Sequence, residues 1–194
     1  MSQPSALEVA ARRWSEALVG WMSVTGSDGE IAFPHKLANR LRSAGYFGDR
    51  PEDVHVLPIS GDTRKRCNLL AFVRGQGRST VVLTGHFDVV SIDNYGDLAP
   101  FAGSPDELTP RLLAELSASG SHPLALSDLQ TGRFLPGRGM LDMKSGLAAG
   151  LAVLEAFAAD PQRRGNLLFL AVPDEENQSA GMRAAAPELA RFAA

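Results

Sequence analysis

Cysteine is nearly absent from this 194-residue sequence, and its scarcity excludes two kinds of structure. Cys67 is the only cysteine, so the chain cannot form an internal disulfide or a zinc site built from several thiolates. Long apolar runs are missing as well, because none approaches the roughly 20 residues that a membrane-spanning helix requires. We therefore expect neither a disulfide framework nor a membrane protein.

The sequence also lacks an excess of basic residues, which argues against nucleic acid as a partner. The chain has 19 lysines and arginines against 22 acidic residues, a net charge of -3 and a pI near 5.8. Such a balance offers no basic surface for a phosphate backbone or an anionic membrane. The charges at Glu8, Arg12, Arg13 and Glu16 interrupt the first residues, so we expect no signal peptide and predict a cytoplasmic location.

Apolar residues, by contrast, are plentiful and regularly spaced. Hydrophobic residues make up 44% of the chain and charged residues 21%, a balance typical of one globular domain with a core. Spacings of three and four residues predict helices, and continuous apolar runs predict buried strands. The expected helices are 7–22, 33–44, 106–116, 141–158 and 181–192. The expected strands are 54–58, 68–73, 79–84 and 166–172.

The order of these elements predicts an α/β fold. Strands and helices alternate in the second half, as in a mixed, largely parallel sheet flanked by helices. The stretch 74–78 is typical of a hairpin turn between two strands. We expect the strand 79–84 to be buried on both faces, because its centre is entirely apolar. Residues 91–136 are rich in proline, glycine, serine and aspartate, and outside 106–116 we expect loops there.

A histidine and an aspartate follow the expected strand 79–84, in the sequence Gly85-His86-Phe87-Asp88. Sheets of this kind place ligands in crevices beyond the carboxyl ends of their strands. His86 can direct one ring nitrogen into such a crevice, while Asp88 accepts a hydrogen bond from the other nitrogen. The alternative is a surface histidine beside a turn aspartate.

The expected strand 166–172 runs into three acidic residues, Asp174, Glu175 and Glu176. Successive carboxylates repel one another, and a buried strand that ends in them is costly unless cations or donors compensate. Adjacent residues at a strand end point in different directions, so one Glu can bind a metal while its neighbour faces water. A solvated acidic turn is an equally good interpretation of this run alone.

Asp142 lies ahead of the expected helix 141–158 and just after Gly137-Arg138-Gly139. Considered by itself, Asp142 is better interpreted as a helix cap than as a carboxylate that bridges two cations. With His86 and Glu176, however, it completes a ligand set suited to Zn²⁺, with Mn²⁺ or Co²⁺ as alternatives. A further Glu supplies a base, and the set fits hydrolysis by a metal-activated water. A phosphate-binding loop is disfavoured, because further glycines are missing.

Three segments together resemble the zinc-dependent exopeptidase and amidohydrolase family that includes glutamate carboxypeptidase, aminoacylase and succinyl-diaminopimelate desuccinylase. The segments are 84–90, 137–146 and 173–176, and they follow one another in the family's order. The forms Asp-Met-Lys-Ser-Gly and Pro-Asp-Glu-Glu-Asn-Gln-Ser-Ala-Gly-Met are similar in particular to its arginine-utilisation branch.

The resemblance implies a role for each residue. His86 would bind one metal ion, Asp142 would bridge two, Glu176 would bind the other, and Asp88 would orient His86. Glu175 would be the general base that takes a proton from the bridging water and delivers it to the leaving amine. The resemblance further implies two divalent ions, Zn²⁺ before Mn²⁺ or Co²⁺, and a peptide or N-acyl amino acid substrate. The peptide bond after Asp142 is expected to be cis.

The resemblance covers an N-terminal portion of the family's catalytic domain. The family needs a further carboxylate after the Glu pair, a late histidine, and a lid domain that contributes to dimerisation. This chain ends 18 residues after Glu176, and its other histidines, His35, His55 and His122, all precede that residue. The segment 91–136 exceeds the family's usual interval and is interpreted as an insertion.

We therefore expect a fragment of a metal-dependent amide hydrolase that binds metal weakly and lacks normal turnover. Homodimer formation is expected of the full-length protein. The alternative is a non-catalytic fragment or family member that keeps the fold and only binds a partner or small molecule.

Overall fold

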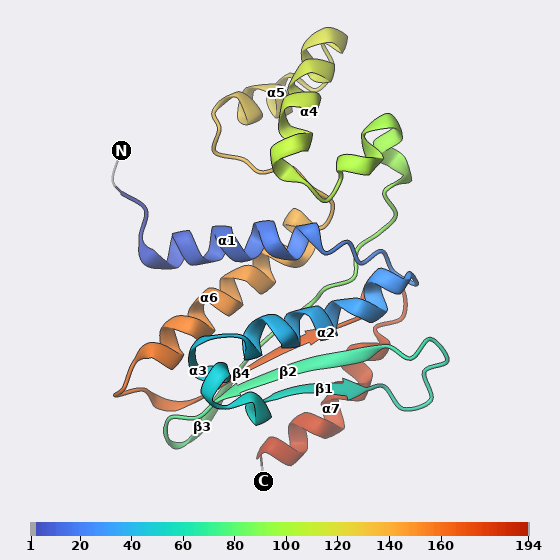
Figure 1. The fold of residues 1–194 in the computed structure, drawn as a ribbon. Coiled ribbons are helices and arrows are strands. Elements are labelled where there is room, and N and C mark those ends of the chain that lie inside the picture. The colour runs from blue at the N-terminus through green and yellow to red at the C-terminus, as the bar shows by residue number, and fades with distance from the viewer. Residues whose placement is uncertain (1–2, 194) are drawn as a thin grey trace.

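A mixed β-sheet lies at the centre of the computed structural model, which describes residues 3–193 (Figure 1). Its four strands have the order β1-β2-β4-β3. β1 pairs antiparallel with β2, β2 pairs antiparallel with β4, and β3 pairs parallel with β4. All four expected strands are confirmed, as is the fold class of a mixed sheet flanked by helices. The strands are β1 (Val54–Pro58), β2 (Cys67–Val73), β3 (Gln76–His86) and β4 (Arg164–Val172).

Two expectations about strand pairing are wrong. Among the described strands one neighbouring pair of three is parallel, so the sheet is not largely parallel. The stretch 74–78 does not join two paired strands, because β4 lies between β2 and β3. The physical reason is burial. The last six residues of β4 are buried, and a strand in the interior of a sheet is hydrogen-bonded to a neighbour along both of its edges.

The expectation of burial on both faces is also wrong for β3. This strand lies at the edge of the sheet, and Val81 and Val82 are 59% and 41% exposed. Valine favours strands wherever they lie in a sheet, so an apolar run alone does not distinguish an edge strand from a central one. The end of the strand differs, because Gly85 and His86 are buried.

Helices cover both faces of the sheet (Figure 1). The helices α1 (Ala6–Gly20), α2 (Asp28–Arg42) and α6 (Ser145–Ala159) lie on one face, and α7 (Ala180–Ala193) lies on the other. The predicted helices at 7–22, 33–44, 141–158 and 181–192 are thereby confirmed within a few residues. None of the helices in residues 3–193 is long and apolar enough to cross a membrane.

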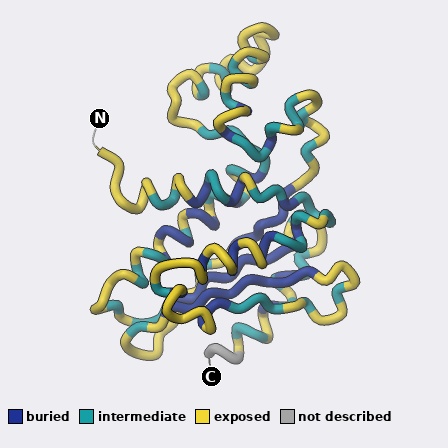
Figure 2. The backbone as a smooth tube through the Cα atoms, viewed as in Figure 1, coloured by how far each residue is buried: buried dark blue, intermediate teal, exposed yellow. Residues whose placement is uncertain are grey.

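Two apolar clusters join these layers. Along β2 and β4 the side chains alternate, as the two-residue period of a strand requires. Leu69 and Phe169 pack in the cluster that α1, α2 and α6 share, whereas Leu70 and Leu168 pack with Ala185 of α7. Both central strands are therefore buried on both faces (Figure 2). The rigid strand ends that result position the residues that follow them.

Residues 91–136 are largely helical, which confirms the helix expected at 106–116 and corrects the expectation of loops on either side of it. They contain a 3₁₀ segment, η2 (Asp93–Phe101), and the helices α4 (Pro105–Ser119) and α5 (Pro123–Gln130). Figure 1 shows these elements projecting from the body beyond α1. The prolines misled the interpretation, because Pro105 and Pro123 occupy the first helical turn, where proline is well tolerated. That this segment is an insertion stays a prediction.

A short helix and a 3₁₀ turn connect α2 to the sheet. They are α3 (Gly45–Asp49) and η1 (Pro51–Asp53). α2 itself begins earlier than expected, because the Ser27 side chain accepts a hydrogen bond from the Glu30 amide and caps the helix. This early start places Glu30 in the interior, where it takes part in the site described next.

Candidate metal centre

The predicted site residues come together beyond the carboxyl ends of β3 and β4. The parallel register pairs His86 with Val172, so the acidic run begins beside the histidine. The ligand atoms of His86, Asp142 and Glu176 lie within 4.8 Å of one another. The Oε2 atom of Glu175 lies 3.6 Å from His86 Nε2. Segments far apart in the sequence thus form one cluster.

Two glycines allow the Asp142 segment to approach the end of β3. A Cβ atom at Gly85 would lie 2.5 Å from the Met143 side chain. Gly139 has a φ of 74°, and a Cβ atom there would lie 2.3 Å from Val89 Cγ1. Because neither position carries a side chain, Asp142 Oδ1 comes within 3.0 Å of His86 Nε2. The peptide bond after Asp142 is cis, as expected.

Asp142 does not cap the following helix, so the helix-cap interpretation is wrong. Its φ of -118° and ψ of 100° are not helical, and Lys144 is the residue that precedes α6. The side chain is 75% exposed, and its carboxylate contacts His86. Asp142 therefore directs its charge into the cluster rather than toward the amides of the helix.

Asp88 is fully buried and holds the backbone of the Glu pair. Its Oδ1 accepts the Glu175 amide at 3.0 Å, and its Oδ2 accepts the Glu176 amide at 3.2 Å and the Thr25 hydroxyl at 3.0 Å. Burial alone would raise the pKa of Asp88, but His86, the two amides and Thr25 outweigh it and lower the pKa. An ionised Asp88 thus orients the residues on either side of the cluster.

His86 is buried and held on both sides of its ring. Nδ1 lies 3.0 Å from the Asp88 carbonyl oxygen and 3.6 Å from its carboxylate, so the carbonyl is the closer partner. Burial lowers the pKa of His86, but hydrogen bonds with Asp88 and Asp142 outweigh it and raise the pKa to about 9. The proton on Nε2 therefore lies between His86 and Asp142, where a cation ligated by both would lie.

The acidic residues of the cluster fit a divalent cation. Burial, followed by the nearby Asp142 carboxylate, raises the pKa of Glu176. Carboxylates that disfavour one another's charge in this way are stabilised by a metal ion. One imidazole nitrogen and two carboxylate oxygens form a donor set suited to Zn²⁺. Within residues 3–193 the structure brings together one group of three side chains that could ligate a metal ion, and it is this one.

The first acidic residue, Asp174, is not solvated but buried. It pairs with the buried Arg66, whose guanidinium also lies 2.7 Å from Asp62 and 3.6 Å from Glu30. Asp174 accepts the amide of Ala180 at 3.0 Å as well, which closes the turn that carries the Glu pair. The interpretation of the acidic run as a solvated turn is therefore wrong for its first residue.

The same buried network reaches Asp88 from the opposite direction. Burial raises the pKa of Glu30, whose carboxylate accepts the Gly26 amide at 2.7 Å. Gly26 follows Thr25, the residue that donates to Asp88. Arg66 is thus connected to the Glu pair through Asp174 and to Asp88 through the segment that Glu30 holds. No pattern in the sequence pointed to Arg66, because its partners lie in distant segments.

Lys144 is a second buried cation that sequence reasoning missed. Its Nζ donates to the Trp21 carbonyl oxygen at 2.8 Å and lies 5.1 Å from the centre of the Phe33 ring. Burial lowers its pKa to about 7. The side chain anchors the Asp142 segment to the end of α1. Its position two residues after Asp142 was the one feature of the sequence that could have indicated a role at this site.

Known proteins are similar to this chain in sequence and in fold. Residues 117–193 match the family described as Peptidase family M20/M25/M40. Protein RocB of Bacillus subtilis is 35% identical over 180 residues, which cover 91% of this chain and 31% of RocB. Succinyl-diaminopimelate desuccinylase of Leptothrix cholodnii is 35% identical over 163 residues, which cover 83% of this chain and 35% of that enzyme. The chain thus spans about a third of the length of these curated relatives.

A solved structure supports the fold independently. The di-peptidase Dug1p of Saccharomyces cerevisiae superposes with a TM-score of 0.64 at 17% identity, over 96% of this chain and 36% of that one. At this identity the likeness concerns the fold alone. The similarity to RocB confirms the expected likeness to the arginine-utilisation branch. Over residues 117–193, the chain is similar to the peptidase M20 family.

Proposed function

We propose that this chain supplies part of the catalytic centre of a metal-dependent hydrolase that cleaves the amide bond of a peptide or N-acyl amino acid. One observation carries the proposal: the ligand atoms of His86, Asp142 and Glu176 converge within 4.8 Å, beside Glu175. The name of one relative, a succinyl-diaminopimelate desuccinylase, supports an N-acyl amino acid as the class of substrate.

The residues of the cluster would hold two divalent ions, Zn²⁺ first and Mn²⁺ or Co²⁺ as alternatives. When bound, such ions would polarise the amide carbonyl and activate water for attack. His86 presents Nε2 to the centre, since the Asp88 carbonyl oxygen holds its Nδ1. Asp142 is suited to bridging, because its exposed carboxylate lies within reach of both His86 and Glu176.

Glu175 is the proposed general base. Its side chain is 52% exposed, so it faces the space that a substrate and water would enter. Its backbone amide is held by Asp88, which limits the directions that the carboxylate can take. The Glu175 carboxylate would take a proton from the attacking water and deliver it to the nitrogen of the leaving amine.

A second candidate function is binding without turnover. Its support is the size of the ligand group, which in residues 3–193 holds three side chains, one of them a histidine. Shared between two ions, three ligands are fewer than a catalytic zinc site uses. We therefore expect this chain alone to bind metal weakly and to lack normal turnover.

Hydrolysis of a panel of N-acyl amino acids and dipeptides separates the two functions. The panel would be run with added Zn²⁺, Mn²⁺ or Co²⁺ on the longest product of the encoding frame. Glu175→Gln is expected to lower kcat by about 10²–10⁴-fold while the ion affinity stays nearly unchanged. Gln178→Ala, an exposed change in the same turn, is the control and should leave kcat unchanged.

Two results would count against the proposal. If the Glu175→Gln variant keeps its activity, the assignment of the base is wrong. If no member of the panel is hydrolysed although the ions bind, the binding function replaces the hydrolase.

A further inference from the structure

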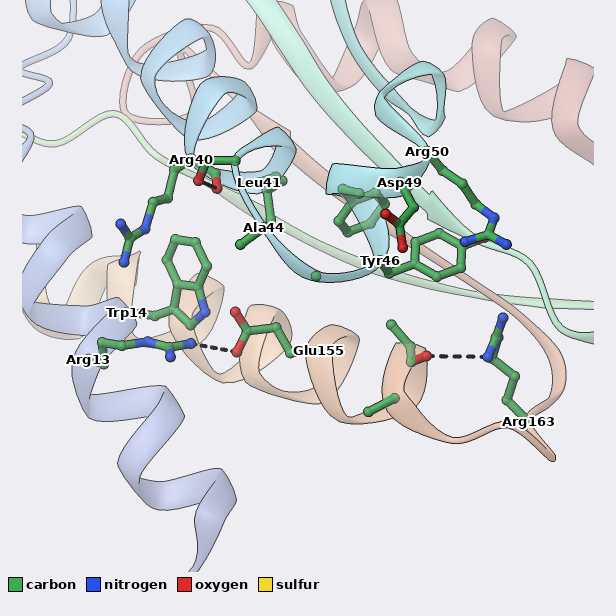
Figure 3. A pocket seen from close by; sticks show the side chains of 15 residues that line it. Arg13, Trp14, Arg40, Leu41, Ala44, Tyr46, Asp49, Arg50, Glu155 and Arg163 are labelled. Atoms are coloured by element: carbon green, nitrogen blue, oxygen red, sulfur yellow. Dashed lines mark hydrogen bonds and ion pairs between the residues drawn. The ribbon is translucent and has the colours of Figure 1, made fainter.

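A cavity lies near the start of β4, at the opposite end of this strand from the metal centre. Figure 3 shows the residues that line it. Its volume is about 660 Å³, within the range typical of small-molecule sites. Arg163, which lines it, immediately precedes β4, whereas the Glu pair follows that strand. The nine residues of β4 separate the two places by roughly 30 Å, at about 3.3 Å per residue. The cavity is therefore distinct from the metal centre.

Positive charge dominates the walls of this cavity. Its charged lining residues are Arg13, Arg40, Arg50, Arg163, Asp49 and Glu155. Arginines thus exceed carboxylates by two. An excess of guanidinium groups around a concave space favours an anionic ligand and disfavours a cationic one.

The arginines differ in whether they are already engaged. Arg13 pairs with Glu155 at 2.6 Å, and Arg163 donates to the carbonyl oxygen of Arg74 at 2.7 Å. The guanidinium of Arg50 lies over the Tyr46 ring, 4.7 Å from its centre. That of Arg40 is exposed and makes no hydrogen bond or ion pair within residues 3–193. Arg40 is therefore the arginine best placed to bind an added anion.

Trp14 contributes a buried donor that lacks an acceptor. Its side chain is 4% exposed, and its Nε1 atom has no hydrogen-bond partner among the described residues. Figure 3 shows the indole nitrogen on the side of the Arg13–Glu155 pair, and Trp14 is one of the residues that line the cavity. Buried indole N–H groups normally donate to an acceptor, so the Trp14 N–H is a donor that a ligand could use.

The remaining walls are apolar. Leu41 and Ala44 line the cavity on one side, and Ala158 and Ala159 at the end of α6 line it on the other. Inorganic phosphate would leave these surfaces uncovered, whereas a molecule with an apolar body would bury them. The cavity thus combines donors for an anion with apolar walls.

We propose that this cavity binds a small organic carboxylate with an apolar body. The carboxylate oxygens accept hydrogen bonds from Trp14 Nε1 and pair with Arg40 and Arg13, which requires the Arg13–Glu155 pair to shift. The apolar body lies against Leu41 and Ala158. The proposal does not rest on the hydrolase activity, because the metal centre lies at the other end of β4.

Nuclear magnetic resonance of the indole groups tests the proposal, with benzoate as the probe. The chain has two tryptophans, Trp14 and Trp21, and Trp14→Phe identifies which indole signal belongs to which residue. Benzoate is expected to shift the Trp14 signal with a Kd on the order of 1 mM and to leave the Trp21 signal in place. Benzamide is neutral, and inorganic phosphate lacks an apolar body. For each of them the Kd should be at least roughly tenfold higher than for benzoate.

A matched pair of variants tests the role of Arg40. Arg40→Gln should raise the Kd for benzoate roughly tenfold, since one charge-assisted contact is lost. Arg12→Gln removes an exposed arginine of α1 that pairs with Glu16 and does not line the cavity, so the Kd should not change. A Trp14 signal that does not move, equal binding of benzamide, preferred binding of phosphate, or a Kd insensitive to Arg40→Gln would each overturn the proposal.

Discussion

The metal centre has a buried side and an open side that are built in opposite ways. On the buried side, Asp88 accepts hydrogen bonds at both oxygens, and Asp174 pairs with Arg66. On the open side, Asp142 is 75% exposed, and its carboxylate approaches both His86 and Glu176. Folding therefore completes the frame of the site, whereas the open side presents charge that suits a cation.

The largest expected effect comes from breaking the buried side at Arg66. Arg66→Met leaves Asp174, Asp62 and Glu30 without their common cation, so the free energy of unfolding should fall by about 3–5 kcal/mol. Urea denaturation measures it. Arg64→Met, the same change at an exposed arginine two residues away, should stay within about 0.5 kcal/mol. Equal effects of the two changes would show that the buried network does not stabilise the frame.

The next effect is a pH dependence that His86 confers in the presence of a chelator. The pKa of His86 is about 9, above its ordinary value of 6.5, so the folded chain binds this proton more tightly than the unfolded one. The contribution is fully present below pH 6.5 and is lost as the pH rises through 9. Such a difference in pKa corresponds to about 3 kcal/mol.

The measurement for this prediction is a difference between two proteins. Burial lowers the pKa of Lys144 to about 7, which acts in the opposite direction at alkaline pH. Comparing the chain with His86→Gln at each pH cancels that contribution. A stability difference that does not change as the pH rises from 6.5 to 9 would contradict the protonation of His86 by its carboxylate neighbours.

Asp88→Asn sharpens the comparison at the boundary of the two sides. Asp88 accepts the Glu175 backbone N–H at one carboxylate oxygen and the Glu176 backbone N–H at the other. The asparagine side chain has a single acceptor oxygen, so it cannot keep both hydrogen bonds in this arrangement. The free energy of unfolding should fall by about 1–3 kcal/mol, and the Kd for Zn²⁺ should rise about 10–100-fold. Asp93→Asn, an exposed change, serves as the control for both measurements.

The smallest effect on stability is expected at Asp142. Asp142→Asn keeps the shape of a side chain that is 75% exposed, so the free energy of unfolding should change by less than about 0.5 kcal/mol. Thermal unfolding in the presence of a chelator measures it. Destabilisation as large as that of Asp88→Asn would remove the distinction between the buried and open sides.

The local parts of this architecture could be predicted from the sequence. β1 has the predicted bounds, His86 ends a strand, and Glu175 and Glu176 follow one, because an apolar run that ends in polar residues is information carried by neighbouring positions. The helix α4 was predicted as 106–116, whereas α5 was missed, since proline at a first helical turn gives the composition of a loop.

The non-local parts could not be predicted from these patterns. Arg66 and Asp174 are 108 residues apart, and nothing near either residue specifies the other. The position of β4 between β2 and β3 depends in the same way on which apolar edges meet in space. Asp142 was misassigned by its local pattern and correctly placed only in combination with His86 and Glu176. The roles of the five site residues stay predictions until they are measured.

The most direct test of the metal centre is a calorimetric titration of the chain and of Asp142→Asn with Zn²⁺. We expect weak, saturable binding by the chain and at least about tenfold weaker binding by the variant, whose fold should be unchanged. Tight binding of two ions by the chain would contradict the expectation of an incomplete site. No saturable binding, or binding that Asp142→Asn does not alter, would contradict the central claim that His86, Asp142 and Glu176 hold a cation together.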